Sequence, residues 1–317
     1  MALRTPTLIK ALIARGDKYP LAVYGSLAGA GLSLAIGVLC MAIAKSKLGP
    51  FSETKIDPRL YYELLFWGGG HVLQFTNTFG VMAGWSLLYT RLSGEKLVSD
   101  KVALLALVVM IGFAIVAPFQ YIGTDVESLE QRQFFTNLKG WGLALGPIIF
   151  GASVVFKRAK MKRDDIVAYN GLLISISLFA LGGLIALTIN GSDTRVPAHY
   201  HGVIGGVTMC YMTLGLMAIV DNGWLAAGGK WLKRQVKIYG AGQGLFVVGM
   251  FIGGVLGLAR KTYGQAQVLD TVEKIFSMGV MGIGGLLAIT GGGLFVTLMT
   301  IGLIRGFKKS GNTQASA

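Results

Sequence analysis

The chain has only three histidines, and two of them, His199 and His201, stand one residue apart at the start of a long apolar run. On an α-helix, residues two positions apart point about 200° away from each other. One metal ion therefore does not easily take both imidazoles, and the spacing favours either two interfacial polar side chains or two ligands that face different groups. The third histidine, His71, also lies in an apolar run. Neutral imidazole nitrogen ligates heme iron, which makes all three residues candidate heme ligands.

Each histidine also has a purely structural interpretation. His71 could simply hydrogen-bond a neighbouring helix, and His199 and His201 could be interfacial side chains that reach toward water. The interfacial interpretation loses weight because Pro197 is expected to start the helix just before the pair. Both imidazoles then lie in the first turns on opposite faces, where they could exchange electrons with a protein outside the membrane.

The elements that carry these residues are membrane-spanning helices. Hydrophobic residues make up 53% of the 317-residue chain and charged residues only 14%, far from the balance of a soluble domain. A helical span takes roughly 20 apolar residues. We predict an all-α fold, a polytopic membrane bundle of about eight transmembrane helices. The expected spans are 21–44, 61–90, 102–122, 134–156, 167–190, 197–220, 237–259 and 276–304.

The basic residues predict the orientation of these spans. Of the 29 lysines and arginines, 19 fall in the termini and loops on one side and 10 on the other. By the positive-inside rule, both termini are cytoplasmic. The formal charge of +14 is then a topology signal that suits anionic lipid, and no nucleic acid partner is expected.

The predicted organisation has three segments. Residues 1–20 form a cytoplasmic amphipathic N-terminal segment, residues 21–305 an eight-helix transmembrane heme-binding domain, and residues 306–317 a cytoplasmic tail. Cys40 and Cys210 fall in apolar segments, so we expect them to be buried and unpaired. The 47 glycines are typical of closely packed membrane helices.

Few titratable groups are expected deep in the membrane. The polar side chains at depth are the histidines and a cluster on the second span. That cluster comprises Gln74, Thr76, Asn77 and Thr78. A proton pump needs a chain of titratable groups, whereas histidines suffice to hold heme. The inventory therefore favours a membrane cytochrome.

Four stretches resemble motifs of the heme-copper oxidase catalytic subunit (cytochrome oxidase subunit I and the nitric oxide reductases), in the order of its C-terminal eight core helices. The stretch SDTRVPAHYHGVIGGV (192–207) resembles the family's tenth-helix motif. This resemblance implies that His199 ligates a high-spin heme and His201 a low-spin heme. The stretch WGGGHVLQF (67–75) resembles the family's sixth-helix motif, in which a histidine binds copper. His71 stands at the position of that histidine. The family's propionate-binding loop resembles GLARKTYGQA (257–266), which assigns that role to Arg260 and Lys261. Its loop before the eighth helix resembles GTDVESLEQRQFFTN (123–137).

The departures from this family concern the copper site and the oxygen chemistry. Two adjacent histidines are expected around Pro118 and Phe119, and neither is present. A single imidazole among apolar neighbours does not retain copper, so we expect no copper. The family's active-site tyrosine is Phe75 here, and its proton-channel lysine is missing from LALGPIIFGASVVF (143–156). The second axial histidine of the low-spin heme belongs to helices outside the resemblance.

We therefore predict a membrane cytochrome b-like subunit, a non-catalytic electron-transfer component of a larger respiratory or redox complex. His71 and His199 would ligate one heme b from opposite sides, and three glycines at 68–70 would leave room for the porphyrin edge. His201 would serve a second heme only if another subunit shares it. Two alternatives stay open. One is an oxygen or nitric oxide reductase component with an open heme site, and the other is a heme-free structural subunit.

The expected partners are other membrane subunits of the complex, lipid, and a c-type cytochrome or another electron-transfer protein on the outer side. The expected location is the bacterial or archaeal cytoplasmic (inner) membrane.

Overall fold

The structure is a computed structural model that describes residues 20–315, with side chains described to residue 308. The predicted amphipathic segment 1–20 lies outside the described residues, apart from Pro20. The long helices, in chain order, are α2 (Leu21–Leu48), α3 (Pro58–Ser93), α4 (Asp100–Val116), α5 (Leu129–Gly142), α6 (Leu145–Phe156), α7 (Ile166–Ala186), α8 (Arg195–Asp221), α9 (Lys230–Val255) and α10 (Val272–Ala315). The described part of the chain has no strand, only an isolated antiparallel bridge between Asp193 and Ala259.

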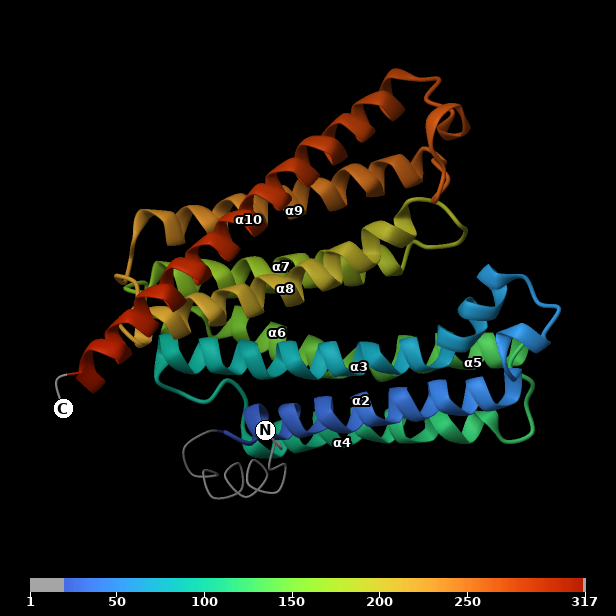
Figure 1. Ribbon diagram of the computed structural model, residues 1–317, viewed down its shortest axis with the longest axis horizontal. Helices are drawn as coiled ribbons and strands as arrows, with labels where there is room; N and C mark the ends of the chain where they lie inside the picture. Colours follow the sequence, from blue (N-terminus) through green and yellow to red (C-terminus); the bar gives the residue numbers. More distant parts are fainter. Residues whose placement is uncertain (1–19, 316–317) are drawn as a thin grey trace. The chain divides into compact units, whose positions relative to one another are not determined.

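The helices form two compact units that divide between Lys160 and Met161. The first unit contains α2 to α6 and the second contains α7 to α10 (Figure 1). Because α10 continues to Ala315, most of the segment predicted as a tail at 306–317 is helical. His71 belongs to the first unit, and His199, His201, Arg260 and Lys261 belong to the second.

The centre of the first unit is α3, which contacts α2, α4, α5 and α6. Asp57 caps its start by accepting the backbone N–H of Arg59 at 2.9 Å, and Pro58 occupies the first helical position, where no N–H is needed. Every residue from 78 to 86 is buried. Since neighbours cover this helix on several sides, it needs no apolar stripe of its own.

Two prolines interrupt the helices of the first unit. The span predicted at 134–156 is two helices, α5 and α6, with a break at residues 143–144. Pro147 causes the break, because it has no N–H for the carbonyl of Leu143 and its ring clashes with that carbonyl. Likewise α4 ends at Val116, and the chain continues through Pro118 as the short 3-10 helix η2 (Ala117–Tyr121).

Glycines let the helices of the second unit approach closely. A Cβ atom on Gly182 of α7 would stand 2.7 Å from the carbonyl oxygen of His199, and one on Gly206 of α8 would stand 2.6 Å from that of Ser175. The Ser175 hydroxyl donates to the Gly206 carbonyl at 2.7 Å. Glycines also let α10 approach α9 closely, because a Cβ atom on Gly242 or Gly249 of α9 would clash with the backbone of α10. Small residues thus bring backbones together where the membrane offers no hydrophobic effect between helices.

Seven helical segments of the described chain are long and apolar enough to cross a membrane, with α5 and α6 counted together. Together with the all-helical architecture, they define a multi-pass membrane protein. The second predicted span, 61–90, falls within α3, which is 36 residues long but is not one of these seven segments. Its polar residues, among them the cluster at positions 74–78, account for this difference.

Candidate heme-ligand site

The first turns of α8 place His199 and His201 on opposite sides of that helix. The helix begins at Arg195, two residues before the predicted start at Pro197. The Nδ1 atom of His199 lies 2.8 Å from the carbonyl oxygen of Gly182, on α7. The His201 ring instead meets Phe246 of α9 edge-on, with ring centroids 5.0 Å apart. The two imidazoles therefore have different neighbours, as their spacing predicts.

The backbone at His201 is held from α9. Gln243, which is 7% exposed, donates its Nε2–H to the His201 carbonyl oxygen at 2.8 Å. Gly205 allows this approach, since a Cβ atom there would lie 2.5 Å from the Gln243 side chain. A carbonyl in the first turns of a helix is thus bound from a second helix, which limits how α8 can rotate.

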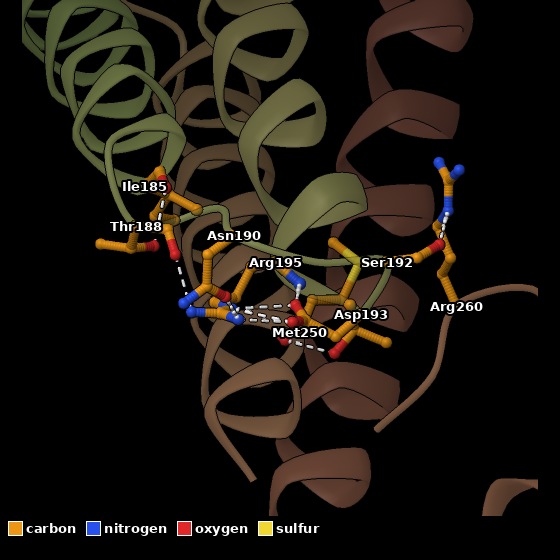
Figure 2. A network of polar contacts seen from close by, with 9 residues as sticks. Ile185, Thr188, Asn190, Ser192, Asp193, Arg195, Met250 and Arg260 are labelled. Carbon is orange, nitrogen blue, oxygen red and sulfur yellow. Dashed lines mark hydrogen bonds and ion pairs between the residues drawn. The ribbon is translucent and has the colours of Figure 1, made fainter. Parts of the chain in front are cut away.

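A polar network precedes α8 and ties its start to α7 (Figure 2). Asp193 and Arg195 form an ion pair with an oxygen–nitrogen distance of 2.6 Å, and their side chains are only 15% and 16% exposed. The Arg195 guanidinium also donates to the Thr188 carbonyl at 2.7 Å and to Asn190 Oδ1 at 2.5 Å. Hydrogen bonds from Arg195 lower the pKa of the Asp193 carboxyl below its ordinary value.

The same network reaches α9 and the loop that follows it. The Thr194 hydroxyl donates to the Met250 carbonyl at 2.8 Å, and the Thr194 N–H donates to the Leu258 carbonyl at 3.0 Å. The Arg260 Nε–H donates to the Ser192 hydroxyl at 2.9 Å. Figure 2 shows the terminal nitrogens of Arg260 pointing away from the Asp193–Arg195 pair.

A cavity of about 230 Å³ opens beside this turn of α8. Pro197 and Tyr200 of α8 line it together with Thr194 just before that helix, and the loop after α9 contributes Arg260 and Lys261. The remaining lining residues are Met250, Leu258, Ala259, Thr262, Gln267, Met278 and Met281. The lining contains two cations, no acidic residue and an apolar floor. The volume of the cavity lies below the roughly 300–1,000 Å³ of pockets that hold a whole ligand, so it suits only one edge of a larger group. The two cations favour an anionic edge.

In the first unit, His71 lies among aromatic side chains on α3. Its Nδ1 atom lies 2.6 Å from the carbonyl oxygen of Trp67, one turn earlier. The His71 ring centroid is 4.7 Å from that of Trp67 and 6.5 Å from that of Phe135, which comes from α5. Glu63, about two turns before His71 on α3, pairs with Arg132 of α5 at 2.8 Å.

The three glycines before His71 have different surroundings. The prediction that Gly68 and Gly69 leave room for a porphyrin edge is wrong. A Cβ atom on Gly68 would meet the ring of Phe135 at 2.8 Å, and one on Gly69 would lie 2.6 Å from the Gly37 carbonyl of α2. Both glycines are therefore needed for helix packing inside the unit. Only Gly70 faces open space.

The positions where the resemblance expects two further histidines lie in η2. Phe119 there is 62% exposed, and Pro118 offers no side-chain donor atom. Among the described residues, no group of three or more His, Cys, Asp or Glu side chains could hold a metal ion. The donor set at His71 is one imidazole with aromatic neighbours. Both cysteines are unpaired and buried, as predicted.

The structure thus brings four of the five predicted site residues to one end of the second unit, while His71 belongs to the first. Four residues of the polar network were not predicted as site residues: Asn190, Ser192, Asp193 and Arg195. Their signal in the sequence was a polar run before an apolar helix. The contact of Ser192 was not readable from the sequence, because its partner Arg260 lies 68 positions further along the chain, beyond the end of α9.

No family model matches the chain. It is 30% identical over 295 residues to an uncharacterized protein of Rickettsia prowazekii (strain Madrid E), a match that covers 80% of this chain and 57% of that protein. It is 32% identical over 177 residues to an uncharacterized protein of Aquifex aeolicus (strain VF5), with 55% of this chain and 42% of that protein covered. The chain spans about half the length of these curated relatives.

Among solved structures, the chain is similar to a heme-copper terminal oxidase determined as a dimer by cryo-electron microscopy. The TM-score is 0.68 at 19% identity, with 94% of this chain and 59% of the oxidase chain covered. At this identity the similarity concerns the fold. The protein therefore has the fold of a heme-copper oxidase-like, multi-pass membrane protein.

Proposed function

We propose that the chain is a membrane cytochrome b-like subunit that passes electrons through histidine-ligated heme within a larger respiratory or redox complex. One observation carries the proposal: His71 and His199 each direct Nδ1 at a main-chain carbonyl, at 2.6 and 2.8 Å. A histidine that ligates a metal commonly donates its other ring N–H to such an acceptor, which fixes the tautomer and the ring orientation. Both rings would then present Nε2 as the ligating nitrogen.

The residues present fit heme b as a cofactor, which would supply a one-electron iron couple. Imidazole nitrogen is a suitable axial donor, and all three histidines lie in apolar helices, with His71 against Trp67 and His201 against Phe246. His199 and His201 point to different neighbours, so a heme at His201 would be distinct from one at His199 and would need a ligand from another subunit. The pairing of His71 with His199 stays a prediction, because the two belong to different units.

Arg260 and Lys261 are proposed to bind the propionates of such a heme. Both line the cavity beside the histidine-bearing turn, and no acidic residue belongs to that lining. Cations suit anionic carboxylates through charge-assisted hydrogen bonds. Their charge would also stabilise the reduced iron and raise its midpoint potential.

The residues do not fit copper. Copper sites in proteins use several imidazole or sulfur donors, whereas the neighbours of His71 are the rings of Trp67 and Phe135. We therefore propose a copper-free subunit that carries electrons without reducing oxygen. Other membrane subunits, lipid and an outer-side c-type cytochrome or similar donor are its proposed partners, in a bacterial or archaeal inner membrane with both termini cytoplasmic.

A spectrum of the purified complex tests this function. We expect a b-type α-band in the reduced-minus-oxidised spectrum, a pyridine hemochrome of heme b, and copper well below one ion per chain by elemental analysis. His199→Gln should reduce the heme content, with the level of folded protein monitored by size-exclusion chromatography. Wild-type protein without heme would overturn the proposal in favour of a structural subunit, and stoichiometric copper bound to this chain would overturn the copper-free assignment.

A further inference from the structure

The segment from Thr188 to Arg195 connects α7 to α8 and carries a polar network that no proposed electron-transfer step uses. All three guanidinium nitrogens of Arg195 are engaged, with Asp193 accepting from Nε at 2.9 Å and from one terminal nitrogen at 2.6 Å. The other partners, Thr188 and Asn190, lie just beyond the end of α7. A planar guanidinium with this many fixed acceptors has little freedom to rotate.

Asp193 also acts on the helix itself. Its Oδ1 accepts the backbone N–H of Arg195 at 2.8 Å, one of the donors at a helix start that has no partner within the helix. The same carboxylate therefore binds both the backbone and the side chain of the first residue of α8. Gly254 of α9 allows the turn to sit close, because a Cβ atom there would lie 2.6 Å from the Arg195 side chain.

The network continues to the second predicted group. Ser192 accepts from Arg260 Nε, and Asp193 forms the backbone bridge with Ala259. Arg260 and the helix start that carries His199 and His201 thus both contact the segment that connects α7 to α8. Figure 2 shows this arrangement, with Asp193 and Ser192 between Arg195 on one side and Arg260 on the other.

We infer that the Asp193–Arg195 pair and its partners form a clip that sets the orientation of His199 and His201 and holds Arg260 in register with them. His199 follows Arg195 by four residues, just over one helical turn, so a shift at the helix start reaches the imidazoles directly. Ligand side chains need their supporting contacts to hold them within about 0.5 Å and 10–20° of the working geometry. Asp193 and Arg195 are positioning residues, and Ser192 positions Arg260. The consequence for heme rests on the proposed function.

The test uses the small number of histidines. The full-length chain, labelled with ¹⁵N-histidine and reconstituted in nanodiscs, has three imidazoles, which His→Gln variants assign. We expect Arg195→Gln to shift the ring resonances of His199 and His201, and Arg195→Lys to restore them in part. Asn190→Ala, which removes one guanidinium partner, should give a smaller shift in the same direction and keeps the test open if Arg195→Gln does not fold.

Lys274→Gln is the matched control, because it breaks another ion pair of the second unit, with Asp270 at 2.7 Å, outside the clip. It should leave all three imidazole signals in place. Unchanged His199 and His201 signals in Arg195→Gln would overturn the inference, and so would equal shifts in Lys274→Gln. These spectra can be recorded with or without heme, so the inference about the clip and the proposed heme binding can be contradicted separately.

If heme is bound, a redox titration gives a second readout. Ser192→Ala should lower the midpoint potential by freeing Arg260 while leaving the histidine resonances unchanged. Arg195→Gln should change both. An unaltered midpoint potential in Ser192→Ala would remove the link between the clip and Arg260.

Discussion

At the residue scale, each candidate ligand is oriented by a main-chain or aromatic contact. His199 is bound to a carbonyl of another helix at 2.8 Å, whereas His71 is bound to a carbonyl of its own helix at 2.6 Å. An intrahelical contact fixes the ring relative to α3 alone. The interhelical contact makes the His199 orientation depend on how α7 and α8 pack, so the two ligands should respond differently to packing changes.

Carbon monoxide binding tests the roles of the three histidines. We expect little spectral change when carbon monoxide is added to the dithionite-reduced wild-type protein, because two imidazoles leave no open position on a six-coordinate iron. His71→Ala should create carbon monoxide binding, and His199→Ala should lose that heme. His201→Ala should spare it and affect only a heme shared with another subunit. Rapid and complete binding by the wild type would contradict the pairing and favour an open-site reductase.

The ion pair of Asp193 predicts a dependence of stability on pH. The folded-state pKa of this carboxyl is lowered by hydrogen bonds from Arg195, relative to about 3.9 in an unfolded chain. The bonds therefore stabilise the folded protein fully above that value, and their contribution is lost as the pH falls through the folded-state pKa. Asp193→Asn should be less stable than wild type at neutral pH, and the thermal unfolding temperatures should converge in strong acid.

Asp270→Asn provides the comparison for this titration. Asp270 also has a pKa lowered by a lysine partner, but its side chain is 58% exposed. Exposed pairs contribute little to stability, so the pH profile of this variant should stay close to that of the wild type. Equal profiles for the two variants would argue against a special role for Asp193.

At the element scale, the contact of α7 with α8 depends on individual glycines. Gly182 faces the backbone of α8, whereas its neighbour Gly183 faces open space. The same residue type in consecutive positions therefore has different functions. Which of the two glycines can be replaced by a larger residue depends on whether it faces the neighbouring helix.

This pair gives a direct prediction for helix packing. Gly182→Ala should destabilise the protein by about 1–3 kcal/mol, as overpacking does elsewhere, and should disturb the hydrogen bond from His199 to the residue 182 carbonyl. Gly183→Ala should be close to neutral, since its Cβ meets nothing. Unfolding in graded detergent mixtures measures both. Equal losses for the two variants would show that the α7–α8 contact is not as close as described.

At the scale of the whole molecule, the predicted orientation follows from the basic loops. The loop before α7 is rich in lysine and arginine, and the loop between α9 and α10 is not as rich. We expect Lys162→Cys to react with a membrane-impermeant maleimide only after permeabilisation, and Gln265→Cys to react in intact spheroplasts. Cys40 and Cys210, both 0% exposed, should give little background. The reverse labelling pattern would contradict a cytoplasmic location of both termini.

The sequence alone predicts the membrane class, the approximate positions of seven of the eight spans, and the divergence of His199 from His201. These features depend on the length of apolar runs and on helical periodicity, which are local properties. The break before Pro147 also has a local cause in the chemistry of proline, but the predicted span 134–156 runs through it without interruption.

Helix packing determines which glycines touch a neighbouring helix and which face open space. It also joins Asp193, Arg195 and Ser192 to Arg260 in one network. Gly68, Gly69 and Gly70 are identical in sequence, so only the side chains of α2, η2 and α5 around them assign their roles. Arg260 meets Ser192 across 68 positions of sequence. Contacts of this kind depend on how helices pack, and no local pattern of residues encodes the partner.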